Sequence, residues 1–188
     1  MQSRPLVYVS RITNLSDARY CAGMGADLLG FVVDPSDPDY VSPESYHQLI
    51  GWISGPARVA ELGKAAVQPE EFRTQYAPEY LHIVFSRLPD VPIGAFPLIV
   101  ELSVDQLSHL PSRPDIAHVL VTDLAKRPSP VVPGGLSVLA AGNPNVGSVV
   151  DYLARAGASG IALQGSRESA PGLKDYDHLS RVLEELNG

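Results

Sequence analysis

Residues 6–44 read LVYVSRITNLSDARYCAGMGADLLGFVVDPSDPDYVSPE, and this stretch decides the fold. An apolar run at 6–10 predicts a strand, a helical pattern follows at 16–24, and a second apolar run at 28–33 predicts another strand. Gly25 follows the helix as a C-cap glycine would. Two apolar strands joined by a helix are typical of a parallel sheet that is covered on both faces.

The same alternation continues along the rest of the chain. Two of the connections are rich in proline and glycine and predict no full helix, namely 86–96 after the fourth strand and 124–135 after the sixth. The sequence predicts eight strands, at 6–10, 28–33, 57–62, 80–85, 98–102, 118–122, 137–141 and 160–163, and six helices, at 16–24, 43–53, 69–76, 104–110, 146–156 and 176–186.

Eight strands with six good helices predict an α/β fold of the (β/α)₈ TIM-barrel type, trimmed by helices that are missing or shortened after strands 4 and 6. An open doubly wound sheet is the other fold that this pattern allows. The length of 188 residues predicts one barrel domain over 1–188. Barrels carry their sites at the carboxyl ends of the strands, so functional residues are expected there.

Composition excludes several function classes. The formal charge of −7 argues against binding to nucleic acid or to an anionic membrane surface. One cysteine, Cys21, forms no internal disulfide, and no apolar run approaches the roughly 20 residues of a membrane span. We therefore expect a cytoplasmic protein.

Both ends of the chain carry family motifs. Residues 8–18, YVSRITNLSDA, match the pattern K-I-C-G-I-T-N-x-x-D-A, and residues 164–175, QGSRESAPGLKD, match S-S-G-V-E-S-x-P-G-x-K-D in part. The chain thus resembles the phosphoribosylanthranilate isomerase family of tryptophan biosynthesis. The resemblance implies a (β/α)₈ barrel and, if the chain is an enzyme, an intramolecular aldose–ketose isomerase. Family members occur as monomers or dimers, so a homodimer or another protein partner is compatible with it.

The resemblance breaks at the catalytic positions. Ser10 stands where the family has its catalytic cysteine. A serine alkoxide is harder to form than a thiolate by roughly 7 pKa units, on the order of 10 kcal/mol, which favours a local structural role for Ser10. Asp123 lies at or next to the position of the family's general acid, with Thr122 as the other candidate. A turn or helix cap is the structural alternative for Asp123.

Three further residues are expected at the substrate pocket. Arg11 replaces a family glycine, and Asp39 replaces an arginine that contacts substrate in the family, which reverses the charge facing an anionic ligand. His82 lies on the fourth strand, which ends Q-L-H-G in the family. A histidine in a strand is more often a core or interface residue satisfied by its neighbours than a ligand.

A phosphate site is expected at the seventh and eighth strand ends. Gly142, Gly165 and Ser166 would supply backbone N–H groups there, as barrels of this kind do. Two ordinary tight turns that need glycine are the alternative. Because the sequence has no Cys/His cluster, Walker loop or GxGxxG motif, no metal and no cofactor are expected.

Three functions remain open on the sequence. The preferred one is a diverged paralogue with weak or no isomerase activity that binds a phosphorylated small molecule or a protein partner. The second is an active isomerase that uses Asp123 as general acid. The third is a barrel enzyme with another activity built around Asp123, Asp34 and Arg11.

Overall fold

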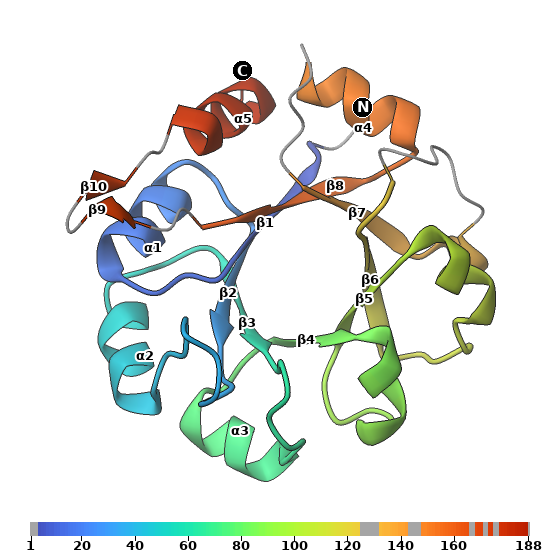
Figure 1. Cartoon of the computed structure of the whole chain (residues 1–188), viewed down its shortest axis with the longest axis horizontal. Helices are drawn as coiled ribbons and strands as arrows, with labels where there is room; N and C mark the ends of the chain where they lie inside the picture. The colour runs from blue at the N-terminus through green and yellow to red at the C-terminus, as the bar shows by residue number, and fades with distance from the viewer. Residues whose placement is uncertain are drawn as a thin grey trace.

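The eight parallel strands close into a barrel. In this computed structural model, which describes residues 4–124, 132–142, 148–165, 168–170, 173–174 and 177–187, the strands follow the order β1 to β8 and β8 pairs with β1. Figure 1 looks into the ring of strands, with the helices arranged around its outside. Leu6 pairs with Gly160 and Ser10 with Gln164, so the sheet has no open edge and the doubly wound alternative is wrong.

The elements are close to those expected from the sequence. Each predicted strand is present within two residues of its predicted ends. The strands are β1 Leu6–Ser10, β2 Leu28–Val32, β3 Ala57–Glu61, β4 Tyr80–Val84, β5 Leu98–Leu102, β6 Ile116–Val121, β7 Ser137–Ala141 and β8 Gly160–Gln164, and the α-helices are α1 Leu15–Gly23, α2 Pro43–Ile50, α3 Pro69–Gln75, α4 Val149–Ala156 and α5 Asp177–Asn187. Residues Glu168–Ala170 (β9) and Leu173–Lys174 (β10) form an antiparallel pair that the sequence did not predict.

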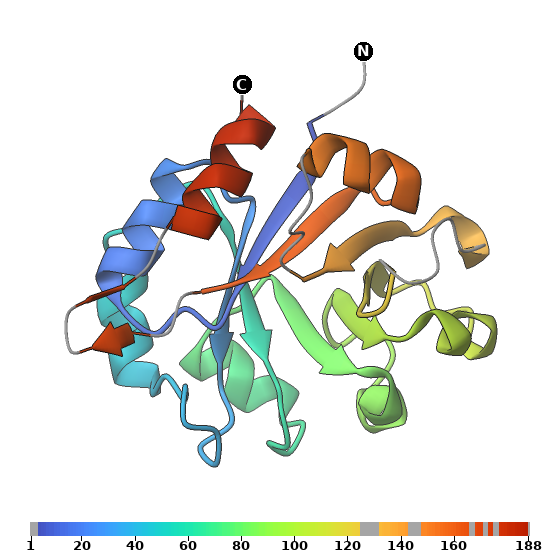
Figure 2. The same cartoon turned by 45° about the horizontal axis from the view of Figure 1, so that its top comes forward.

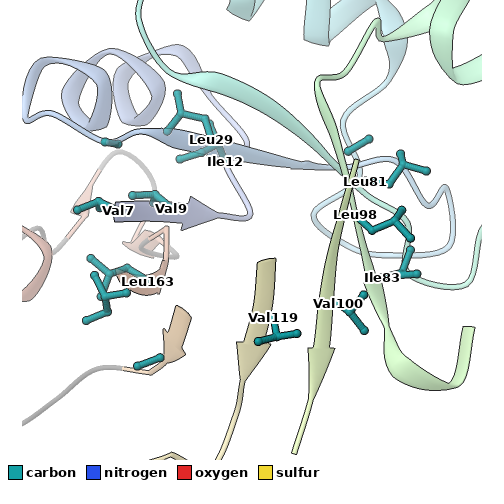
Figure 3. Packing of buried hydrophobic residues seen from close by; sticks show 14 of the residues in the cluster. Val7, Val9, Ile12, Leu29, Leu81, Ile83, Leu98, Val100, Val119 and Leu163 are labelled. Carbon is teal, nitrogen blue, oxygen red and sulfur yellow. The ribbon is translucent and has the colours of Figure 1, made fainter. Parts of the chain in front are cut away.

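Successive side chains of each strand point to opposite faces of the sheet, and this divides the core into two parts. In β1, Val7 and Val9 pack in the layer between the barrel and the helices, whereas Tyr8 packs inside the barrel. Figure 3 shows the outer layer, in which residues of neighbouring strands such as Leu81 and Leu98 lie close together. Burial on both faces explains why these strands read as continuous apolar runs.

Three connections are shorter than a full α-helix. The link after β4 holds only the 3₁₀ helix η1 (Phe85–Asp90), and the described part of the link after β6 holds only η3 (Pro133–Gly135), which agrees with the predicted trimming. The predicted helix at 104–110 is instead the 3₁₀ helix η2 (Val104–His109). Pro111 follows directly, so the segment has no room for further α-helical turns.

A buried ion pair strengthens the trimmed side of the barrel. Arg113 Nε and Nη2 donate to both carboxylate oxygens of Asp115 at 3.0 and 2.7 Å, and both side chains are more than nine-tenths buried. Arg113 Nη1 also donates to the carbonyl groups of Leu88 and Val91, next to η1. The pair therefore holds the η1 connection where a helix would otherwise pack.

The helices α4 and α5 pack against each other, and they lie side by side at the top of Figures 1 and 2. Over the part of the chain that is described, no helix combines the length and the apolar character needed to cross a bilayer.

Candidate functional site

A cavity of about 360 Å³ opens at the carboxyl ends of the strands. Its walls come from β1 and from β4 to β8 together with the residues that directly follow them, so barrel closure brings distant parts of the sequence together there. The lining residues are Ser10, His82, Glu101, Leu120, Thr122, Ala141, Gly142, Ala162 and Gln164.

Ser10, at the end of β1, lines this cavity but is bound to backbone groups. Its hydroxyl donates to the carbonyl oxygen of Leu163 at 3.1 Å, and its own carbonyl accepts from Gly165 N–H at 2.8 Å. The side chain is buried, with 8% of the residue exposed. The described hydrogen bonds of Ser10 thus join β1 to β8 and direct the hydroxyl proton to a carbonyl oxygen rather than to a base.

Arg11 and Asp39, two of the departures from the family pattern, bind each other. Arg11 Nε donates to Asp39 Oδ2 at 2.6 Å, and Arg11 Nη2 donates to Asp37 Oδ1 at 2.6 Å. None of the three residues is among those that line the cavity. The guanidinium of Arg11 neutralises Asp39, and the expected reversal of charge toward a ligand stays a prediction.

The backbone of Arg11 explains the glycine that the family has at this position. Arg11 has a φ of 59°, in the left-handed region that favours glycine. Arg11 N–H donates to Glu61 Oε1 at 2.9 Å, which holds the turn in this conformation together with the two ion pairs.

Of the two candidates for the general-acid position, Asp123 and Thr122, only Thr122 is among the described residues that line the cavity. Asp123 Oδ1 accepts a hydrogen bond from the N–H of Val104 at 2.8 Å, the first residue of η2, and Asp123 is not among the cavity residues. Thr122, the alternative position, lines the cavity. The carboxylate of Asp123 thus caps η2, and its role as a general acid stays a prediction.

The N–H groups of the two glycines of the expected phosphate site already donate to backbone carbonyl groups. Gly142 N–H donates to the carbonyl oxygen of Ala162 at 3.2 Å, and Gly165 N–H donates to the carbonyl oxygen of Ser10 at 2.8 Å. A phosphate bound here would need other donors. Ser166, the third expected residue, lies outside the described residues.

His82 belongs to a chain of polar side chains across the barrel interior. Its Nδ1 lies 3.0 Å from the hydroxyl of Tyr8, and its Nε2 lies 3.1 Å from Glu101 Oε2. The Tyr8 hydroxyl donates to Glu61 Oε1 at 2.9 Å. The sequence prediction placed His82 at the pocket and Glu101 only among the strand ends where a site is expected, and it did not include Tyr8 or Glu61. A usable signal was present, because a lone carboxylate near the end of an apolar strand stands out in ARVAE at 57–61 and LIVEL at 98–102.

The surroundings shift the pKa values of two of these polar side chains, Glu101 and Tyr8, in opposite directions. The hydrogen bond from His82 lowers the pKa of the Glu101 carboxyl, although partial burial opposes this. Burial raises the pKa of Tyr8 well above its ordinary value, and the nearby Glu61 carboxylate raises it further. Glu101 is thus held as a carboxylate at neutral pH, and Tyr8 as a neutral phenol.

Asp34, one residue of the third functional alternative, has a structural role. Its carboxylate accepts hydrogen bonds from the N–H of Lys64 at 2.7 Å and from the N–H and hydroxyl of Ser36 at 2.9 and 2.7 Å. Burial works against its ionisation, but these hydrogen bonds outweigh it and lower the pKa of Asp34. Asp34 thereby ties the loop after β2 to the loop after β3. In the described part of the chain, no three His, Cys, Asp or Glu side chains are grouped to hold a metal ion.

Comparison with known proteins identifies the relatives. No family model matches the chain. The N-(5'-phosphoribosyl)anthranilate isomerase of Nostoc punctiforme is 24% identical over 209 aligned positions, which cover 96% of this chain and 97% of the relative. The phosphoribosylanthranilate isomerase of Thermus thermophilus superposes with a TM-score of 0.72 at 20% identity, covering 97% of this chain and 98% of that one.

Two further solved structures bear on ligand and assembly. A phosphoribosylanthranilate isomerase in complex with reduced 1-(o-carboxyphenylamino)-1-deoxyribulose 5-phosphate superposes with a TM-score of 0.69 at 18% identity, covering 98% of this chain and 99% of that one. Monomers generated from the dimeric enzyme of Thermotoga maritima superpose with a TM-score of 0.68 at 18% identity, with the same coverage. The relatives and solved structures compared above are phosphoribosylanthranilate isomerases, which confirms the resemblance predicted from the sequence.

Proposed function

We propose that this chain is a diverged phosphoribosylanthranilate isomerase-like barrel that binds a small molecule at its mouth and has weak or no isomerase activity. The observation that carries the proposal is Ser10, which occupies the position of the family's catalytic cysteine and donates its proton to the carbonyl oxygen of Leu163.

The chemistry of Ser10 supports the loss of a general base. Forming an alkoxide from a hydroxyl is harder than forming a thiolate by roughly 7 pKa units, on the order of 10 kcal/mol. A neighbouring base could lower this cost. The hydrogen bonds described for Ser10 go to backbone groups of Leu163 and Gly165, neither of which accepts a proton at neutral pH.

The charge of the cavity supports the same conclusion. The ligand of the solved relative carries a carboxyl and a phosphate group, as its name states. No lysine or arginine is among the described residues that line this cavity, and Glu101 contributes a carboxylate to it. Two like charges 4 Å apart repel by about 4 kcal/mol at an effective dielectric constant of 20. The described lining therefore disfavours a ligand of that charge.

An active isomerase is the second candidate, with Asp123 as general acid. Asp123 directly follows Thr122, which lines the cavity, so a small shift of the connection after β6 would bring the carboxylate toward a ligand. This shift would break the hydrogen bond that Asp123 accepts from the N–H of Val104.

The two candidates differ in turnover. Purified protein is mixed with freshly prepared phosphoribosylanthranilate, and the loss of its fluorescence is compared with the uncatalysed rate. We expect the natural sequence to show no turnover or only a small excess over the uncatalysed rate. Turnover of at least about 1 per second, the low end for typical enzymes, that Asp123→Asn abolishes would refute the proposal and establish the second candidate.

A Ser10→Cys variant serves as the matched control, because it restores only the family's base. We expect it to stay inactive, since Glu101 still makes the cavity acidic. Turnover by this variant would show that the single base, and not the charge of the cavity, accounts for the inactivity of the natural sequence.

A further inference from the structure

A continuous hydrogen-bonded chain crosses the barrel below the mouth cavity. It runs from Glu61 on β3 through Tyr8 on β1 and His82 on β4 to Glu101 on β5, with donor–acceptor separations of 2.9, 3.0 and 3.1 Å. We call these four residues the Glu61–Glu101 chain. Two of its members, His82 and Glu101, line the cavity.

The interior of the barrel is shaped around this chain. A Cβ atom added at Gly30 on β2 would lie 1.9 Å from Glu61 Oε1 and 2.6 Å from the Tyr8 hydroxyl oxygen. Any other residue at position 30 would therefore displace the Tyr8–Glu61 hydrogen bond. Tyr8 is fully buried and Glu61 is 8% exposed, so both depend on their partners to satisfy their polar atoms.

The hydrogen bonds of the Glu61–Glu101 chain hold Glu101 from the interior of the barrel. Glu61 Oε1 accepts from both the Tyr8 hydroxyl and Arg11 N–H. The Tyr8 oxygen lies 3.0 Å from His82 Nδ1, and His82 Nε2 lies 3.1 Å from Glu101 Oε2. The His82 ring is therefore fixed by Tyr8 on one side and contacts the Glu101 carboxylate on the other.

Glu101 is the member of the Glu61–Glu101 chain that presents a carboxylate to the cavity. The Glu101 side chain is 36% exposed, whereas that of His82 is 11% exposed. The other polar side chains of the lining, those of Ser10, Thr122 and Gln164, are neutral hydroxyl and amide groups. The described surface of the cavity therefore combines one accessible carboxylate with groups suited to hydroxyls.

From this arrangement we infer that the mouth of the barrel binds a small polyhydroxylated molecule that carries a protonated amine, with the ammonium group on Glu101. The inference rests on the proposed function, because it names the ligand class of the same cavity. Glu101 accepts the charge-assisted hydrogen bond, and the remainder of the Glu61–Glu101 chain holds that carboxylate in place. A phosphorylated ligand is the competing class.

Three compounds on the same carbon chain test the ligand class: 1-amino-1-deoxyribitol, ribitol and ribitol 5-phosphate. Their dissociation constants for the natural protein are measured by calorimetry at pH 7 and low ionic strength. We expect the amine to bind at least about tenfold more tightly than ribitol, and the phosphate to bind most weakly. The inference is overturned if the phosphate binds best, if the amine and ribitol bind equally, or if none of the three binds.

Two controls assign the preference to Glu101. Glu101→Gln should bring the amine to within about twofold of ribitol, whereas Glu184→Gln, which removes an exposed carboxylate of α5, should leave the tenfold preference intact. If Glu101→Gln does not fold, N-acetylated aminoribitol serves instead, because acetylation removes the charge from the ligand. A preference that survives acetylation would also overturn the inference.

Failure of this inference is distinguishable from failure of the proposed function. If the phosphate binds best and phosphoribosylanthranilate is not turned over, only the ligand class is wrong. If phosphoribosylanthranilate is turned over, the proposed function is wrong, whichever ribitol derivative binds.

Discussion

Substitution of Gly30 by alanine tests how tightly the barrel interior is built around its polar chain. Gly30 lies on β2, where the added Cβ atom would lie 1.9 Å from Glu61 Oε1, 2.9 Å from Glu61 Cδ and 2.6 Å from the Tyr8 hydroxyl oxygen. Contacts shorter than about 3 Å do not occur between such atoms, so the carboxylate of Glu61 has to move. It then loses its hydrogen bonds from Tyr8 and from Arg11 N–H, both 2.9 Å long.

The expected loss of stability follows from these two hydrogen bonds. A hydrogen bond to a charged group contributes about 1.5–3 kcal/mol, so the upper limit is about 3–6 kcal/mol. Replacing glycine in a strand returns about 0.5–1 kcal/mol through the lower entropy of the unfolded chain. Because the side chain of Glu61 relaxes in part, we expect Gly30→Ala to lower the free energy of unfolding by about 2–4 kcal/mol.

Urea unfolding followed by circular dichroism measures this change, with the midpoint shifting at an unchanged slope. Gly23→Ala is the matched control, since Gly23 ends α1 and a Cβ atom there meets nothing within 4 Å. We expect this control to be stabilised by about 0.5 kcal/mol. The reasoning is refuted if the free energy of unfolding of Gly30→Ala lies within about 0.5 kcal/mol of that of the natural protein. It is also refuted if Gly30→Ala lowers the free energy of unfolding equally in a Glu61→Ala background, where most of the clash is gone.

Three further predictions concern ion pairs. Arg113→Met should lower the free energy of unfolding by about 3–5 kcal/mol, since it leaves the Asp115 carboxylate buried without its partner; a loss below 1 kcal/mol in urea would contradict this. Arg113 also lowers the pKa of Asp115, so the stability that this carboxylate contributes is present above its ordinary pKa of about 3.9 and is lost as the pH falls further. Below pH 4, unfolding midpoints should therefore fall more steeply for the natural protein than for Asp115→Asn, and parallel curves would argue against it. At Arg11, replacement by glycine should be less destabilising than replacement by methionine by about 1 kcal/mol. Both variants lose the ion pairs with Asp39 and Asp37, but only glycine relieves the positive φ. Equal free energies of unfolding for the two variants would show that the backbone there is unstrained.

The sequence alone determined the barrel and the family resemblance. Strands such as 6–10 and 98–102 are continuous apolar runs bounded by turn residues, and this pattern is local, so it can be read without knowing what each strand contacts. The replacement of the catalytic cysteine by Ser10 is equally a property of one position. The α-helix expected at 104–110 is the 3₁₀ helix η2 instead, because a six-residue 3₁₀ helix shows the same apolar periodicity as a short α-helix.

Only the tertiary structure decided what the residues at the mouth do. Asp39 pairs with Arg11, Asp123 caps η2, and Gly165 donates its N–H to the carbonyl oxygen of Ser10. The Glu61–Glu101 chain likewise joins residues on four strands, whose side chains meet only when the barrel closes. Such contacts depend on the register between strands and on the path of each loop, and neither is encoded in the local pattern of apolar and polar residues.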